Sequence, residues 1–160
     1  MIKVDLHSHS TISDGLMTPS SLVSHAAAQG VQVLGLTDHD DVAGIAEARV
    51  AALEHDITLI AGTEISVTWR NRTLHILGLR IDPQHPTLQQ GLTRVRDSRF
   101  GRAQSIAAEL DKICIQNSLE GARQYASEGI IGRTHFARFL IAQGHAKDMK
   151  TVFKRYLVKG

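Results

Sequence analysis

The sequence is poor in the residue types that define several classes of protein. Its single cysteine, Cys114, excludes an intramolecular disulfide, so cysteine usage does not point to a secreted, disulfide-stabilised fold. Aromatic residues make up only 4% of the chain, so the core must be mainly aliphatic. No apolar run approaches the roughly 18 residues of a membrane span, and the N-terminus lacks the apolar stretch of a signal peptide. We therefore expect a cytoplasmic chain that contacts no membrane, and its 160 residues suit one domain.

Histidine is abundant, and charge is unevenly distributed along the chain. There are nine histidines. Residues 1–85 carry five Lys and Arg against ten Asp and Glu, whereas residues 86–160 carry 13 against six. An acidic, histidine-rich front half suits cations, and a basic rear half suits phosphates or nucleic acid. We accordingly treat residues 1–85 and 86–160 as separate parts of the chain.

Hydropathy patterning predicts an α/β fold in the front half. Apolar runs at residues 2–6, 31–37 and 57–61 predict strands, with His7 and His9 just past the end of the first. Residues 65–69 and 74–81 are expected to form a hairpin. Helices are expected between the first three strands, one beginning at Thr18-Pro19 and stopping at Gly30, the other over residues 42–55. Strands that alternate with helices indicate a largely parallel sheet.

The rear half reads as mostly helical. Apolar positions from Leu88 to Ile113 predict one long helix, or two with a break near Gly101. Shorter helices are expected at residues 119–127, 134–143 and 148–157.

Residue types that bind metals follow the ends of successive predicted strands. Loops at the carboxyl ends of parallel strands are where α/β folds place their sites, and the two histidines of a His-x-His strand point to the same side. Taken singly these signals are weak, since His39 could lie in a helix cap and Glu64 could be a lone surface carboxylate. Together they predict one metal site, composed of His7, His9, Asp14, His39, Glu64 and His75. Imidazoles and carboxylates without thiolates suit Zn²⁺, Mn²⁺ or Fe²⁺, and so many ligands indicate a multinuclear centre.

These motifs resemble the polymerase and histidinol phosphatase (PHP) domain family. The resemblance is carried by Asp5–His9, Asp14-Gly15, Thr37–Asp40, Gly62–Ile65 and His75–Gly78. In the rear half, residues 132–138 and 152–157 resemble the insertion of a bacterial subgroup, the 3′,5′-nucleoside bisphosphate phosphatases that also act as 5′-to-3′ exoribonucleases. The resemblance implies the front portion of a distorted (β/α)₇ barrel, with a mostly helical insertion after the fourth or fifth strand. It also implies up to three divalent ions, most often manganese.

The resemblance also implies how the ligands are shared. His7, His9 and Glu64 would hold the first ion, Glu64 and His75 the second, and Asp14 and His39 the third. The family completes these sites with a later histidine and an Asp-x-His pair, which the sequence does not contain. We therefore expect each ion to lack one protein ligand, and the chain alone to have little or no phosphatase activity. We also expect it to associate through an open sheet edge.

The activity implied is metal-dependent hydrolysis of phosphate esters in 3′,5′-bisphosphonucleosides or at the 5′ end of short RNA, by a metal-activated hydroxide. Arg133 and His135 would orient the substrate phosphate, a role that the family match favours over the alternative of a solvated helix start. The basic stretch from Arg94 to Arg102 is more simply a solvated helix face. No DNA partner is expected. The alternatives are a truncated, non-catalytic module that binds metal or RNA, and hydrolysis of amides by the same kind of hydroxide.

Overall fold

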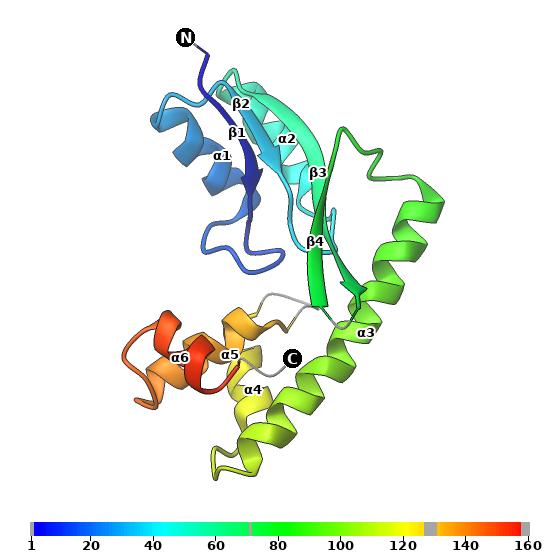
Figure 1. Ribbon diagram of the computed structural model, residues 1–160. Helices are drawn as coiled ribbons and strands as arrows, with labels where there is room; N and C mark the ends of the chain where they lie inside the picture. Colours follow the sequence, from blue (N-terminus) through cyan, green and yellow to red (C-terminus); the bar gives the residue numbers. More distant parts are fainter. Residues whose placement is uncertain (1, 71, 127–130, 158–160) are drawn as a thin grey trace. The chain divides into compact units, whose positions relative to one another are not determined.

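The computed structural model of the chain describes residues 2–70, 72–126 and 131–157 (Figure 1). It divides into two compact units, residues 1–95 and 96–160, and each unit has a hydrophobic core of its own. The first unit reaches ten residues beyond the charge-based division at residue 86, because Leu88 and Leu92 pack against the first core.

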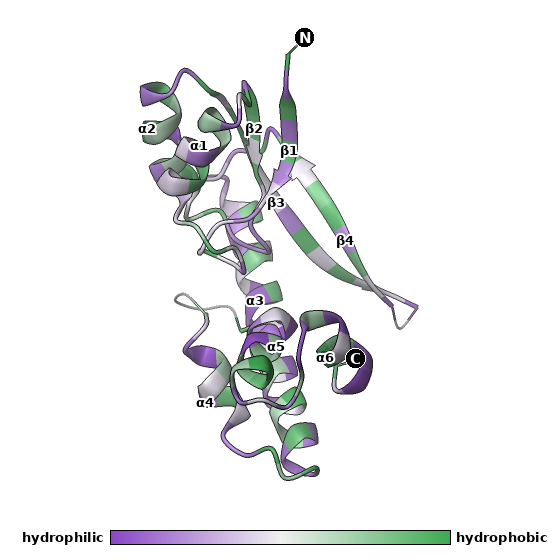
Figure 2. Cartoon of the chain, turned by 90° about the vertical axis from the view of Figure 1, so that its left-hand side faces the viewer, coloured by the Kyte–Doolittle hydropathy of each residue, from purple (hydrophilic) through white to green (hydrophobic). Residues whose placement is uncertain are grey.

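The first unit is a four-stranded sheet with helices on one face. Its strands are β1 (Val4–Ser8), β2 (Val33–Leu36), β3 (Thr58–Trp69) and β4 (Arg72–Leu79), in the order β1-β2-β3-β4. The first three are parallel and β4 is antiparallel to β3. Helices α1 (Pro19–Ala28) and α2 (Ile45–Glu54) lie together against one face of the sheet (Figure 2). This arrangement confirms the α/β class and leaves the opposite face for polar residues.

The core of this unit is aliphatic, as the composition requires. Leu34 and Leu36 of β2 are almost completely buried beneath Val23 of α1 and the fully buried Ala48 of α2. Alternate residues of a strand point to opposite faces, so residues 34 and 36 share the face that the helices cover. The sheet therefore has one apolar face and one face free to carry a site.

One expectation about the strands was wrong. Residues 57–61 and 65–69 were expected to be separate strands, but they belong to the single 12-residue strand β3. The first part of β3 pairs with β2 through Ala61, and from Gly62 onward it pairs with β4. Because β3 exchanges β2 for β4 as its pairing partner, its backbone remains hydrogen-bonded without an intervening loop. Glu64 therefore lies inside a strand and not after one.

Helix α1 begins where the sequence predicts it. Thr18 is the N-cap, and its hydroxyl oxygen accepts a hydrogen bond of 3.2 Å from the Ser21 backbone N–H. Pro19 occupies the first turn, where no N–H is needed.

We expect Thr18→Ala to destabilise the first unit by about 1 kcal/mol, because it leaves an N–H at the helix start without its acceptor. Urea unfolding followed by circular dichroism would measure the loss. Thr18→Ser retains the hydroxyl and is the matched control. Equal stability of the alanine and serine variants would show that the cap contributes nothing.

The second unit consists of helices packed on their own core. The long helix α3 (Pro86–Asp111) enters it, followed by α4 (Ser118–Arg123), α5 (Arg133–Ala142) and α6 (Met149–Arg155). Helix α3 continues without a break through Gly101, so the single-helix alternative holds. Phe136, Leu140 and Val152 are completely buried between these helices. Within the described ranges, no helix is both long and apolar enough to cross a bilayer.

Candidate metal centre

The six predicted ligands come from different elements of the first unit and converge on one place. They are His7 on β1, His9 just after it, Asp14 in the following loop, His39 after β2, Glu64 within β3 and His75 on β4. Within each of three overlapping groups of these residues, ligand atoms lie within 4.8 Å of one another. The structure therefore places in one cluster residues as distant in sequence as His7 and His75.

A bulge in β1 directs its histidines to the open face of the sheet. Asp5 lies opposite Leu34, yet Ser8 and not His7 lies opposite Leu36, so β1 uses one more residue than β2 over this stretch. With regular pairing His7 would share the face of Leu36, beneath the helices. Gly35 makes the bulge feasible, since a Cβ there would lie 2.7 Å from the Leu6 carbonyl oxygen. Strand β1 begins and ends two residues later than predicted, so His7 lies inside the strand and not past its end.

Glu64 is the centre of the cluster. Its Oε2 lies 2.8 Å from Nε2 of His7 and 3.1 Å from Nε2 of His9, while its Oε1 lies 3.2 Å from Nδ1 of His75. Nδ1 of His39 is 3.7 Å from Oε2. Four imidazoles thus surround one carboxylate, an arrangement in which both carboxylate oxygens can take part in binding ions.

The backbone holds His39 and Glu64 side by side. Glu64 N–H donates to the Asp38 carbonyl oxygen at 3.1 Å, and Asp40 N–H donates to the Glu64 carbonyl oxygen at 3.0 Å. This pair of bonds makes a short bridge of parallel type between His39 and Glu64. The Asp40 carboxylate, completely buried, accepts a further bond of 2.7 Å from the Ser66 N–H. The segment after β2 is therefore anchored to β3 on both sides of Glu64.

The spacing of the donor atoms fits divalent ions. Ligand atoms bound to one ion at about 2.1 Å lie about 3 Å from each other. Nε2 of His7 lies 3.1 Å from Nε2 of His9, and both lie near the same Glu64 oxygen. The three groups are His7, His9 and Glu64; His9, Asp14 and His39; and His39, Glu64 and His75. The donor set, imidazole nitrogens and carboxylate oxygens, is one that binds manganese, zinc or iron.

The histidines also determine the charge of Glu64. Burial alone would raise the pKa of Glu64, because it penalises the charged carboxylate. The hydrogen bond from His7 and the charges of His39, His9 and His75 act in the opposite direction and prevail, so the pKa of Glu64 is lowered. The carboxylate is therefore ionised at neutral pH, as a metal ligand must be.

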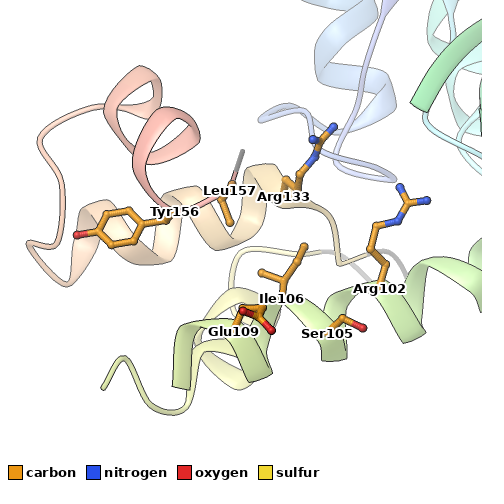
Figure 3. Close-up of a pocket in the computed structure, with 7 residues that line it drawn as sticks. All are labelled: Arg102, Ser105, Ile106, Glu109, Arg133, Tyr156 and Leu157. Atoms are coloured by element: carbon orange, nitrogen blue, oxygen red, sulfur yellow. The ribbon is translucent and has the colours of Figure 1, made fainter. Parts of the chain in front are cut away.

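Arg133 lies in the second unit and lines a pocket of about 110 Å³. In Figure 3 the guanidinium groups of Arg102 and Arg133 lie at one end of this pocket, and the Tyr156 ring lies at the other. Ile106 and Leu157 supply apolar lining between them, and Ser105 and Glu109 complete it. The guanidinium carbon of Arg133 lies 6.0 Å from the centre of the Phe153 ring, at the outer limit of a cation–π contact.

Helix α3 forms one wall of this pocket. Residues 102, 105, 106 and 109 follow the spacing of one helix face. The sequence did not lead us to place Arg102 in a site, although its spacing with residues 105, 106 and 109 on one helix face could have indicated this. The basic stretch contains four arginines at similar intervals, so the signal alone does not select Arg102.

His135 is placed differently from Arg133. Its side chain is almost completely buried near the start of α5, and its Nδ1 accepts a hydrogen bond of 3.0 Å from the Gly132 N–H. An accepting Nδ1 places the ring proton on Nε2 in the neutral form. His135 therefore stabilises the first turn of α5, and contact with a substrate stays a prediction.

Comparison with known proteins assigns the family. The PHP domain matches residues 5–157, nearly the whole chain and every residue of the cluster. The chain belongs to the PHP domain family. Two curated PHP relatives are a 3′,5′-nucleoside bisphosphate phosphatase of Chromobacterium violaceum and a 5′-3′ exoribonuclease of Escherichia coli, 44% and 46% identical to this chain. The matches cover 100% and 98% of this chain but 56% and 54% of those relatives.

Solved structures agree with this assignment to the PHP family. An amidohydrolase of Chromobacterium violaceum with bound sulfate matches with a TM-score of 0.91 and 43% identity, over 98% of this chain and 55% of that one. A protein of Bifidobacterium adolescentis described as a metal-dependent phosphoesterase matches with a TM-score of 0.88 and 29% identity, over 97% and 55%. The PHP chain thus spans about half the length of the relatives it matches. The fold expected from the motifs is confirmed over that half.

The three groups of neighbouring ligand atoms share more residues than the ligand sets that the resemblance implies. His9 contributes to the group of His7 and Glu64 and also to that of Asp14 and His39, and His39 in turn is shared with Glu64 and His75. The expectation assigned each of these histidines to one ion. Sharing follows from the close packing of the imidazoles, since the rings of His9 and His39 lie 4.7 Å apart.

Proposed function

We propose that this chain supplies the divalent-metal centre and a phosphate-contact pocket of an enzyme that hydrolyses phosphate esters of nucleotides. One observation carries the proposal: three overlapping groups of ligand atoms lie together, and two of them share the ionised Glu64. The proposed substrates are 3′,5′-bisphosphonucleosides or the 5′ end of short RNA, and two curated relatives are named a 3′,5′-nucleoside bisphosphate phosphatase and a 5′-3′ exoribonuclease. Manganese as the ion and a cytoplasmic location belong to the same proposal.

The protein side chains have distinct roles in this proposal. His7, His9, Asp14, His39, Glu64 and His75 would hold the ions, with Glu64 shared between two of them. Bound divalent ions supply a nucleophilic water at neutral pH and neutralise the charge that develops on the phosphate oxygens. The buried anchors of Glu64 and His39 keep these ligands in place, so little reorganisation is needed when ions bind.

The second unit supports the substrate part of the proposal. Arg102 and Arg133 present two cations at one end of a pocket whose remaining lining is partly apolar. Guanidinium groups bind phosphate oxygens through paired hydrogen bonds. His135 is buried and is not among the residues that line this pocket, so in this proposal it holds the start of α5, where Arg133 lies, through its bond from the Gly132 N–H.

The direct test is phosphate release from a 3′,5′-bisphosphonucleoside by the chain with excess Mn²⁺, compared with a longer protein that contains the remaining PHP segments. The proposal requires release that stops when a chelator removes the metal and returns when Mn²⁺ is restored. We expect the 160-residue chain to be slower than the longer protein by more than about tenfold, or roughly 1.4 kcal/mol in barrier height, because it spans only about half the length of its curated relatives. No metal-dependent release by either protein would refute the proposal.

Two alternative functions would give different experimental results. Hydrolysis of an amide by the same centre is favoured by the description of one relative as an amidohydrolase, and release of amine from an acylated amino acid, without phosphate release, would identify it. A non-catalytic binding module is favoured by the separate, basic helical unit. Retained RNA binding with zero turnover in the longer protein would identify that function.

The phosphate-contact pocket leads to a prediction of its own. We expect Arg133→Ala to weaken nucleotide or short RNA binding by roughly 1–3 kcal/mol, because a charge-assisted hydrogen bond to phosphate is lost. Fluorescence titration at several salt concentrations would measure it, and binding should weaken as salt rises. Arg123→Ala is the matched control, since Arg123 lies on α4 beside Glu120 and not in the pocket. Equal losses for both variants would contradict a specific role for Arg133.

A further inference from the structure

The loop that carries Asp14 is folded around a buried carboxylate outside the ligand set. Asp38 is only 2% exposed. Its Oδ1 accepts hydrogen bonds from the Ser10 N–H at 2.8 Å and from the Ser13 hydroxyl at 2.6 Å. Its Oδ2 accepts one from the Ser10 hydroxyl at 2.7 Å. Ser10 and Ser13 are themselves buried, so three protein donors replace the water that this carboxylate would otherwise need.

Ser10 organises the rest of the loop. The N–H groups of Ser13 and Gly15 both donate to the Ser10 carbonyl oxygen, at 3.1 and 2.9 Å. At Gly15 the backbone passes directly over His9, since a Cβ there would lie 2.2 Å from the His9 carbonyl oxygen. A displacement of Ser10 would therefore move His9, its neighbour in the chain, and Asp14, which lies between Ser13 and Gly15.

The backbone of Asp38 is tied to a different ligand. Its carbonyl oxygen accepts hydrogen bonds of 3.1 Å from the Glu64 N–H and 3.1 Å from the Thr63 hydroxyl. The next residue along the chain is His39. One residue thus joins three segments that carry ligands: the Ser10–Gly15 loop, the end of β2 and the middle of β3.

We propose that Asp38 is a positioning residue, whose carboxylate holds the Ser10–Gly15 loop so that Asp14 lies beside His9 and His39. The inference deepens the proposed metal centre and rests on it for the identity of the ligands. The contacts explain why a carboxylate is needed. Asparagine offers one acceptor oxygen in place of two and must turn its amide toward a serine donor, and alanine leaves the buried Ser10 N–H without an acceptor.

The first experiment follows the loop without any metal. In the metal-free protein we expect Asp38→Asn to raise the hydrogen-exchange rates of the Ser13 and Gly15 amides at least tenfold, relative to the amides of Leu34 and Leu36. Ala48→Gly is the control, because it weakens α2 within the same core and touches no ligand segment. Unchanged loop exchange in Asp38→Asn, or the same selective rise in Ala48→Gly, would overturn the proposal.

The second experiment counts ions. Titration with Mn²⁺ alone, followed by the paramagnetic signal of free Mn²⁺, should show that Asp38→Asn weakens the same class of site as Asp14→Asn by tenfold or more. Combining the two substitutions should cause no further loss. Additive losses, or full Mn²⁺ affinity in Asp38→Asn, would overturn the positioning role. An unaltered chain that binds no Mn²⁺ would refute the metal centre itself, and the exchange experiment would still decide whether Asp38 holds the loop.

A milder variant covers the case in which Asp38→Asn does not fold. Ser13→Ala removes one donor and leaves the carboxylate with both bonds from Ser10. We expect it to raise exchange at Gly15 and to weaken the same Mn²⁺ site, both by less than Asp38→Asn does. Loop exchange and Mn²⁺ affinity identical to those of the unaltered chain would contradict the proposal.

Discussion

Glu64→Gln should lower the affinity for Mn²⁺ by more than about 100-fold at two of the three groups of ligands. Substitutions of residues that only support metal ligands already cost about 10–100-fold in affinity, and Glu64 itself belongs to two groups. The substitution keeps the shape of the side chain and removes its charge. The pKa of Glu64 lies below its usual value, so the unaltered side chain is ionised at neutral pH and the full charge is lost.

Isothermal titration calorimetry or equilibrium dialysis with Mn²⁺ would measure this loss. Glu54→Gln makes the same chemical change at an exposed position at the end of α2 and should bind Mn²⁺ like the unaltered chain. The group of His9, Asp14 and His39 does not include Glu64 and should retain its ion in Glu64→Gln. Complete retention of Mn²⁺ by Glu64→Gln would show that the cluster is not built around this carboxylate.

Phe136→Ala should unfold the helical unit while leaving the metal centre able to bind. Phe136 is completely buried in the second core, and truncating a buried phenylalanine to alanine costs about 3–5 kcal/mol. A loss of this size is comparable with the total stability of a small domain. The six candidate ligands and the core beneath them belong to the first unit, so Mn²⁺ affinity should change little.

Loss of helical signal in circular dichroism, together with Mn²⁺ titration, would check both halves of this expectation. Phe100→Ala is a matched control, because the Phe100 side chain is 46% exposed and should contribute much less to stability. Simultaneous loss of helix and of Mn²⁺ binding in Phe136→Ala would mean that the two cores unfold as one.

The six candidate ligands lie together as their places near strand ends predict, although one of those places was expected wrongly. Glu64 was expected to follow a strand over residues 57–61. In the structure β3 runs straight through Glu64 and exchanges β2 for β4 as its partner. Pairing between distant segments overrides a local pattern, so a single sequence cannot show where a strand changes partner.

Other features depend on packing that no spacing reveals. The spacing of His7 and His9 predicts a shared side, but the bulge that selects which side arises from pairing with β2. The sequence does not indicate the role of Asp38, because only the folded loop shows which groups donate hydrogen bonds to its carboxylate. Likewise, the choice of Arg102 among four arginines depends on where α5 and α6 lie against α3.

Because of the bulge in β1, His7 and His9 either both face the metal centre or both face the apolar layer. A strand has two sides, and each added or deleted residue exchanges them, so no intermediate placement exists. His7 and His9 share the same phase and must enter or leave the centre together. Point substitutions around β1 would weaken the centre by degrees, whereas a one-residue deletion between Asp5 and His7 would turn both imidazoles into the apolar layer. Insertions and deletions in these few residues should therefore be the changes that such a chain tolerates least.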